Sequence, residues 1–117
     1  MIAVTGAAGF IGSNIVHELN RRGRTDLLVV DVHPTDEGNA NLDPLQYERY
    51  FEKDAFQAWI SDAANAQSLE TVFHMGACSS TTETDAEYLD SNNFGYTRDL
   101  CLACLAAGVR FFNASSA

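Results

Sequence analysis

The sequence has 117 residues, 46% of them hydrophobic and 20% charged, so it can bury one core and has no room for a second domain. Sixteen acidic and seven basic side chains give a net charge of −9, which argues against nucleic acid or an anionic membrane as partner. No apolar run approaches the ~20 residues that span a bilayer, no basic segment precedes the first apolar run, and three cysteines do not suggest a disulfide framework. We therefore expect a globular, cytoplasmic chain.

The first twelve residues carry the most informative pattern. Apolar residues 2–4 predict a strand, glycines follow at 6, 9 and 12, and residues 10–22 have the periodicity of a helix. The apolar face of this helix is expected to hold Ile11, Ile15, Val16 and Leu19. In such a unit Gly6 allows the turn, Gly9 leaves room for phosphates and Gly12 lets the helix approach the sheet. This geometry binds a dinucleotide diphosphate, although three glycines alone also fit an ordinary strand-to-helix turn.

A second strand pattern covers residues 27–32 and carries Asp31 at its end, nineteen residues past Gly12. An acid at the end of the second strand is where a dinucleotide-binding fold holds the ribose hydroxyls of the adenosine. The glycine turn and Asp31 together favour dinucleotide binding over an ordinary turn.

The rest of the chain continues to alternate between the two kinds of element. Residues 33–44 predict an exposed loop, and residues 47–51 a short edge strand. Asp54 is a candidate N-cap for a helix with an apolar stripe of Phe56, Trp59, Ile60 and Ala63. The pattern continues with a strand at 71–74 and a turn at 76–80. It ends with a helix that runs from a Thr84–Glu87 capping box to Ala107, with Gly108 after it, and with a strand at 111–112. It predicts an α/β fold, a parallel sheet with helices on both faces.

Several segments then match one family in the expected order. They are T-G-A-A-G-F-I-G at 5–12, V-F-H-M-G-A at 72–77, N-N-F-G at 92–95 with Thr97 and Leu100, and A-S-S-A at 114–117. Together they resemble the extended short-chain dehydrogenase/reductase family of NAD-dependent epimerases and dehydratases. The run H-M-G-A-C-S-S-T-T-E at 74–83 is similar to H-E-G-A-C-S-S-T-T-E of the ADP-L-glycero-D-manno-heptose 6-epimerases, with Met75 in place of their acid.

The resemblance implies that residues 1–117 are the N-terminal part of an NAD(P)-binding Rossmann domain of strand order 3-2-1-4-5, without the C-terminal substrate domain. It implies inversion at C6 of ADP-D-glycero-D-manno-heptose through a transient ketone with bound NADP, in lipopolysaccharide core synthesis. It also implies a homo-oligomeric, pentameric enzyme without a metal site, in which Ser116 is catalytic. The cofactor contacts that it implies are Gly6, Gly9, Phe10, Ile11, Gly12, Asp31, Val32, Lys53, Met75, Gly76, Ala77, Cys78, Ser79 and Asn92.

Some features depart from this pattern and leave alternatives open. The Tyr-x-x-x-Lys pair of the family does not occur in these 117 residues, so we expect weak cofactor binding and no epimerisation by this chain alone. Asp31 would repel a 2′-phosphate and favours NAD, whereas the resemblance implies NADP, with Lys53 near the phosphate. Another nucleotide-sugar epimerase or dehydratase, or a non-catalytic dinucleotide-binding module, remains an alternative.

Other reactive side chains are expected to be structural. His74 is expected to support the end of its strand rather than act as a base. Cys101 and Cys104 form a C-x-x-C pair without a second pair, which favours small apolar packing over metal binding. His17 is expected to face solvent.

Overall fold

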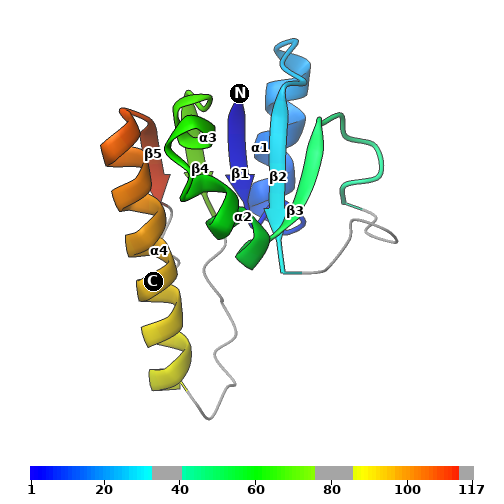
Figure 1. Cartoon of the computed structure of the whole chain (residues 1–117). Coiled ribbons are helices and arrows are strands. Elements are labelled where there is room, and N and C mark those ends of the chain that lie inside the picture. The colour runs from blue at the N-terminus through cyan, green and yellow to red at the C-terminus, as the bar shows by residue number, and fades with distance from the viewer. Residues whose placement is uncertain (33–40, 76–85, 114–117) are drawn as a thin grey trace.

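The computed structural model describes residues 1–32, 41–75 and 86–113, with the backbone alone described for residues 86–94. Along the described residues the elements follow one another in the order β-α-β-β-α-α-β-α-β (Figure 1). The elements are β1 (Ile2–Thr5), α1 (Phe10–Arg21), β2 (Leu27–Asp31), β3 (Arg49–Glu52), α2 (Lys53–Ile60), α3 (Ala63–Gln67), β4 (Thr71–His74), α4 (Ala86–Ala107) and β5 (Arg110–Asn113). Each strand predicted from the sequence is present, although β3 begins two residues later than expected.

All five strands are parallel and form one sheet in the order β3-β2-β1-β4-β5, which confirms the predicted fold class and strand order. The chain moves from β1 outward to β3 and then returns to the other side of β1 to form β4. Right-handed crossovers in opposite directions place the connecting helices on opposite faces. Figure 1 accordingly shows α1 on one face of the sheet and α2, α3 and α4 on the other. The reversal at β1 is the point where doubly wound sheets bind ligands, beside the C-terminal ends of the strands.

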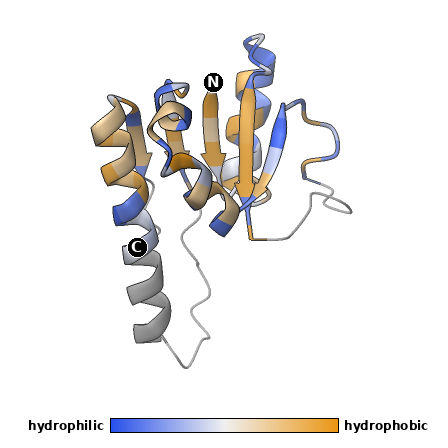
Figure 2. Ribbon diagram, viewed as in Figure 1, coloured by the Kyte–Doolittle hydropathy of each residue, from blue (hydrophilic) through white to orange (hydrophobic). Residues whose placement is uncertain are grey.

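The core has one part on each face of the sheet. Successive residues of a strand point to opposite faces, so Ala3 packs under α2, α3 and α4 while Val4 packs under α1. Both faces are covered, and β1 and β2 are therefore nearly continuous apolar runs (Figure 2). Leu42 is 1% exposed and joins the core on the α1 face, so the prediction of an exposed loop at 33–44 was wrong for this residue.

The buried face of α1 is narrower than the sequence predicted. Val16 is fully buried and Ile15 and Leu19 are partly buried against the α1-face core, as expected. Ile11 is 60% exposed, so its assignment to the apolar face was wrong. In the first turn of α1 it is Gly12 that lies against the backbone of the glycine turn at residues 6 and 7, and the neighbouring Ile11 is not part of this contact.

Two helices replace the single helix expected after β3. Helix α2 ends at Ile60, and Asp62 starts α3 by accepting a hydrogen bond from the Ala64 amide at 2.9 Å. Ala63 is therefore the first residue of α3 and is exposed, whereas the predicted stripe put it on the buried face. The N-cap of α2 is Glu52, not Asp54: its Oε1 accepts from the amides of residues 54 and 55 at 3.1 and 3.3 Å.

Helix α4 reaches Ala107, as predicted, and Gly108 follows it with a φ of +75°. Leu100 and Cys104 are fully buried in the core, which confirms apolar packing for Cys104. Thr84 of the predicted capping box lies outside the described residues. Within residues 1–32, 41–75 and 86–113, neither α4 nor any other helix combines the length and the apolar character needed to cross a membrane.

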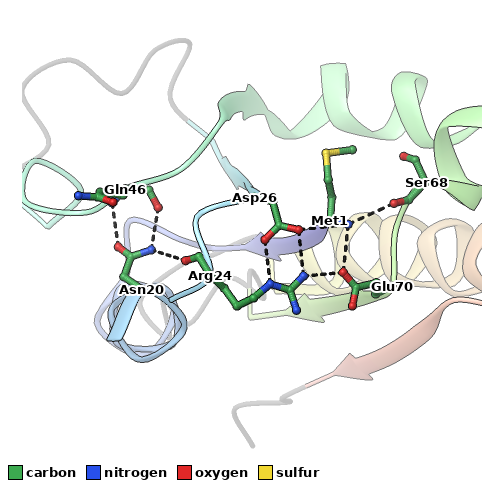
Figure 3. Close-up of polar contacts among 7 residues, drawn as sticks. All are labelled: Met1, Asn20, Arg24, Asp26, Gln46, Ser68 and Glu70. Carbon is green, nitrogen blue, oxygen red and sulfur yellow. Dashed lines mark hydrogen bonds and ion pairs between the residues drawn. The ribbon is translucent and has the colours of Figure 1, made fainter. Parts of the chain in front are cut away.

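Polar contacts join the elements at the N-terminal edge of the sheet (Figure 3). The Arg24 guanidinium bonds to Asp26 at 2.8 Å and also to Glu70, and the α-amino group of Met1 lies 3.2 Å from Glu70. The hydrogen bond from Arg24 lowers the pKa of Asp26 to about 2. These charges lie at the end of the sheet opposite the glycine turn, so they hold the strands without entering the candidate site.

Candidate functional site

The backbone of the turn between β1 and α1 lies in close contact with the first turn of α1. Gly6 has a φ of +64°, a left-handed conformation that glycine adopts without a steric penalty. The Gly9 amide donates to the Gly6 carbonyl at 3.0 Å and closes the turn. A Cβ on Gly12 would lie 2.1 Å from the Gly6 carbonyl oxygen and 2.9 Å from the Cα of Ala7. Position 12 therefore requires glycine, because the helix and the turn are in backbone contact there.

The N-terminus of α1 has no side-chain cap. Its N-cap residue is Gly9, and its first turn contains no acidic residue. Phe10 and Ile11, the first two helical residues, are 81% and 60% exposed. The first N–H groups of a helix have no partner within the helix, and the helix dipole places partial positive charge at this end. The arrangement is chemically suited to a phosphate or another anion.

Asp31 holds the glycine turn from the neighbouring strand. Its Oδ2 accepts a hydrogen bond from the Ala8 amide at 2.7 Å, and its Oδ1 accepts from the Val32 amide at 2.7 Å. Asn41 completes the arrangement by donating from Nδ2 to the Ala8 carbonyl at 2.8 Å. Both the backbone N–H and the backbone carbonyl of Ala8 are thus fixed by side chains from outside the turn. Each carboxylate oxygen of Asp31 retains a second lone pair that can accept a hydroxyl from a ligand.

Lys53 lies at the same edge of the sheet, immediately after Glu52, which pairs with Asp31 in the β2–β3 register. Its ammonium is 5.4 Å from the centroid of the Tyr96 ring on α4, within cation–π range. The Tyr96 hydroxyl donates to the Lys53 carbonyl at 2.8 Å. Burial, followed by smaller effects of the Asp54 and Glu52 carboxylates, raises the pKa of Tyr96. Lys53 is thus tied to α4, and the residue as a whole is half-buried.

The end of β4 is fixed by a buried histidine. His74 is 3% exposed and lies between two hydroxyls: Nδ1 is 2.6 Å from Thr5 Oγ1 and Nε2 is 2.8 Å from Thr97 Oγ1. Burial lowers the pKa of His74 to about 4, so the ring is neutral at pH 7. Both ring nitrogens are occupied by protein partners, which agrees with the predicted supporting role and leaves neither nitrogen facing a substrate.

Almost the whole chain matches one known protein family. Residues 2–117 match the profile of the NAD dependent epimerase/dehydratase family. The chain belongs to this family. The described strands, the glycine turn and Asp31 occupy the arrangement expected of its cofactor-binding part.

Individual relatives of this epimerase/dehydratase chain support the family assignment. The ADP-L-glycero-D-manno-heptose-6-epimerase of Alkalilimnicola ehrlichii is 50% identical over 117 residues, which are 100% of this chain and 37% of the relative. A short-chain dehydrogenase/reductase superfamily protein from Agrobacterium tumefaciens, solved with bound NAD, has a TM-score of 0.64 and 31% identity over 99% of this chain and 32% of its own. The Helicobacter pylori ADP-L-glycero-D-manno-heptose-6-epimerase has a TM-score of 0.74 at 24% identity over 99% of this chain and 39% of its own, which shows the fold alone. The chain thus spans about a third of the length of these relatives.

Part of the predicted site of this epimerase/dehydratase chain lies together at one edge of the sheet. These residues lie at, or directly after, the C-terminal ends of four neighbouring strands. Gly6, Gly9 and the start of α1 follow β1, Asp31 ends β2 and is followed by Val32, Lys53 follows β3, and Met75 follows β4. Val32 is 60% exposed directly after Asp31. Outside the described residues lie Gly76, Ala77, Cys78, Ser79 and the predicted catalytic Ser116. Asn92 lies in α4, where the backbone alone is described, and its cofactor contact stays a prediction.

Sequence reasoning did not predict the contact of Asn41 with the glycine turn or the hydrogen bonds of the two threonines that flank His74. Asn41 is surrounded by residues with the composition of a loop, and only the fold shows that it reaches the turn at Ala8. Thr5 is at the end of the first strand and could have been noticed, because a polar residue that ends an otherwise apolar buried strand needs a hydrogen-bond partner. Thr97 was noted only as part of the family segment at 92–100, and its hydrogen bond to His74 gave no local signal, because the partner is 23 residues away on another element.

Proposed function

We propose that this chain is the dinucleotide-binding part of an ADP-L-glycero-D-manno-heptose 6-epimerase. The observation that carries the proposal is the 50% identity, over all 117 residues, with a relative of that name. The run at 74–83 adds support, because it resembles these epimerases in residues that follow β4 rather than in the shared glycine turn.

The described residues fit a bound nicotinamide dinucleotide. The uncapped N-terminus of α1, with Gly9 before it, suits the diphosphate, since backbone N–H groups and the helix dipole both favour an anion there. Asp31 is rigidly held through Ala8 and Val32 and can accept a hydrogen bond from a ribose hydroxyl. When bound, such a cofactor would take a hydride from the substrate carbon and return it to the opposite face.

The chain's own residues would bind and orient the reactants. In this proposal the Ser116 hydroxyl hydrogen-bonds the substrate oxygen while its charge changes, which lowers the barrier to proton transfer. The acid/base pair and the sugar-binding residues of the whole enzyme are proposed to lie in the two thirds of the relatives' length that this chain does not span. We also propose, from the family resemblance, that the whole enzyme is a homo-oligomer.

NADP is the proposed cofactor, and NAD is the alternative. In this proposal the Asp31 carboxylate faces the adenosine ribose, where it would repel a 2′-phosphate. The cation of Lys53 lies on the same edge of the sheet and is proposed to offset this repulsion. The family description names NAD, and the Agrobacterium structure contains NAD.

Calorimetric titration of the purified chain with NADP and with NAD tests both parts of the proposal. We expect measurable heat with both and tighter binding of NADP. Lys53→Ala should weaken NADP and leave NAD nearly unchanged, because only NADP carries the phosphate. Tighter binding of NAD to the wild type would overturn the NADP assignment, and the absence of binding of either dinucleotide to folded chain would overturn the proposed function. The epimerisation itself is tested on the full-length protein with ADP-D-glycero-D-manno-heptose.

A further inference from the structure

One buried imidazole connects three elements that meet beside the candidate site. Thr5 ends β1 and His74 ends β4, and the two residues pair directly in the parallel register. His74 Nδ1 lies 2.6 Å from Thr5 Oγ1, and its Nε2 lies 2.8 Å from Thr97 Oγ1 on α4. Thr5 and His74 are 2% and 3% exposed. We call Thr5, His74 and Thr97 the hydroxyl–imidazole relay.

The relay also fixes the first residue after β4. The Met75 amide lies 3.1 Å from Thr5 Oγ1 and 3.2 Å from the Thr5 carbonyl oxygen, so one N–H is shared between two acceptors of Thr5. Thr5 is followed at once by Gly6, which opens the glycine turn. The start of the turn and the start of the segment after β4 are therefore held by the same side chain.

The protonation of the relay can be assigned from its partners. A neutral imidazole has one donor and one acceptor nitrogen. If Thr5 donates its hydroxyl hydrogen to Nδ1, its oxygen still accepts from Met75, and Nε2–H donates to Thr97. The opposite tautomer would leave the buried Thr5 hydroxyl hydrogen without an acceptor among the described residues, which is costly. The first arrangement runs in one direction from Met75 through Thr5 and His74 to Thr97.

We propose that the relay is a positioning device for the nicotinamide side of the bound dinucleotide. This inference rests on the proposed function, in which Met75 and Asn92 contact the cofactor. The bond from His74 to Thr97 sets the distance between α4 and the end of β4. Because Thr97 follows Asn92 by five residues, about one and a half helical turns, this bond also fixes the part of the helix that carries Asn92. Thr5, His74 and Thr97 touch no ligand in this proposal; they act by fixing the elements that do.

Aromatic rings already pack against His74, so the two threonine hydroxyls are not needed to fill space around it. The ring centroid of His74 is 5.8 Å from those of both Phe111 and Tyr96, so the imidazole is held among other rings on two sides. These contacts fill space and would be retained if a hydroxyl were removed. The hydrogen bonds add direction, since they fix the rotation of the ring and the approach of α4.

Thr97→Val and Thr97→Ser, compared with the wild type, test the inference. The ligands are NADPH or NADH, whichever the wild type binds more tightly, and ADP-ribose, which lacks the nicotinamide. Binding is measured by calorimetry, and the fluorescence of the bound reduced nicotinamide reports its surroundings. Loss of one positioning hydrogen bond is expected to weaken the reduced dinucleotide about three- to tenfold in Thr97→Val. ADP-ribose should change less than twofold, and Thr97→Ser should restore both the affinity and the fluorescence.

The outcomes separate this inference from the proposed function. If the wild type binds neither ligand, the proposed function fails and the relay has no role in it. If the wild type binds and folded Thr97→Val binds equally well, or loses both ligands to the same degree, the positioning role alone is refuted. Thr97→Ala serves in place of Thr97→Val if the latter does not fold, because it removes the same hydroxyl and Thr97 is only half-buried.

Discussion

At Gly12 a single added carbon atom has a defined structural consequence. Its Cβ would lie 2.1 Å from the Gly6 oxygen and 2.7 Å from the Gly6 carbonyl carbon, and backbone atoms cannot rotate out of the way. Gly12→Ala is expected to lower the free energy of unfolding by about 1–3 kcal/mol, the usual effect of overpacking. Urea denaturation followed by circular dichroism measures the loss, and dinucleotide affinity should fall with it because the turn must move.

Gly95→Ala is the matched control for this substitution. Gly95 lies in α4, and a Cβ there meets nothing within 4 Å. The higher helix propensity of alanine should raise the free energy of unfolding by about 0.5–1 kcal/mol. A similar loss of stability in both variants would show that the close contact at Gly12 is not the cause.

His74 should make the chain less stable in mild acid. Burial lowers its folded-state pKa to about 4, below the ordinary value of 6.5, so between these values the unfolded chain binds more protons. The stability that His74 contributes is complete above pH 6.5 and is lost as the pH falls towards 4. From two-state linkage the loss at pH 5 is about 2 kcal/mol. Urea denaturation at pH 7.5 and pH 5 measures it.

The carboxylates also respond to acid, so the histidine effect needs a difference measurement. His74→Gln retains a polar side chain but does not titrate, and its unfolding free energy should change by about 2 kcal/mol less than that of the wild type over the same pH interval. An equal pH dependence in the two proteins would mean that His74 protonates in the native state without penalty.

At the scale of single elements, two acidic residues near the start of α2, Glu52 and Asp54, have different roles. Glu52 Oε1 accepts two amide hydrogen bonds, whereas Asp54 is a residue of the first turn. Glu52→Ala should reduce the free energy of unfolding by about 1 kcal/mol, as loss of an N-cap does. Asp54→Ala removes only a favourable charge near the helix dipole and should cost about half as much or less. Thermal unfolding of both variants distinguishes the assignments, and the reverse order would support Asp54 as the cap.

The order of the elements was predictable, but some boundaries were not. Apolar runs and glycines located β1, α1, β2 and β4, because buried strands and helix ends have strong local signals. The break between α2 and α3 was missed, since Phe56, Ile60 and Ala63 keep helical spacing across it. Asp62 can cap a new helix there, and this local hydrogen bond prevailed over the apolar periodicity.

The candidate site was predictable where its residues follow a strand in sequence. Asp31 was found from its place at a strand end, but the sequence did not indicate that its carboxylate already accepts from Ala8. The contacts of Asn41 with the turn and of Thr97 with His74 join residues 33 and 23 positions apart. Pairings of this kind depend on the three-dimensional fold, and no local pattern of residue types encodes them.

At the scale of the whole molecule, the sheet is covered unequally. Helix α1 packs over the β1 and β2 half of its face, whereas Phe112 on β5 is 51% exposed. Its ring stacks on that of Phe73 with a centroid distance of 5.4 Å, which extends the apolar surface from the core towards β5. Among the described strands β5 pairs only with β4, so its outer edge has no strand partner. An apolar face beside an open edge favours association between chains.

We therefore expect the isolated chain to self-associate at micromolar to millimolar concentration, the range in which exposed apolar edges aggregate. Phe112→Lys places a charge on this edge strand and removes apolar surface, and it should weaken self-association roughly three- to tenfold. Phe10→Ser is the matched control: Phe10 is 81% exposed but lies at the start of α1, away from β5. Sedimentation velocity over a concentration series measures both. Equal weakening by the two substitutions would indicate non-specific apolar contact, whereas an effect confined to Phe112 would identify the β5 edge as the surface through which chains associate.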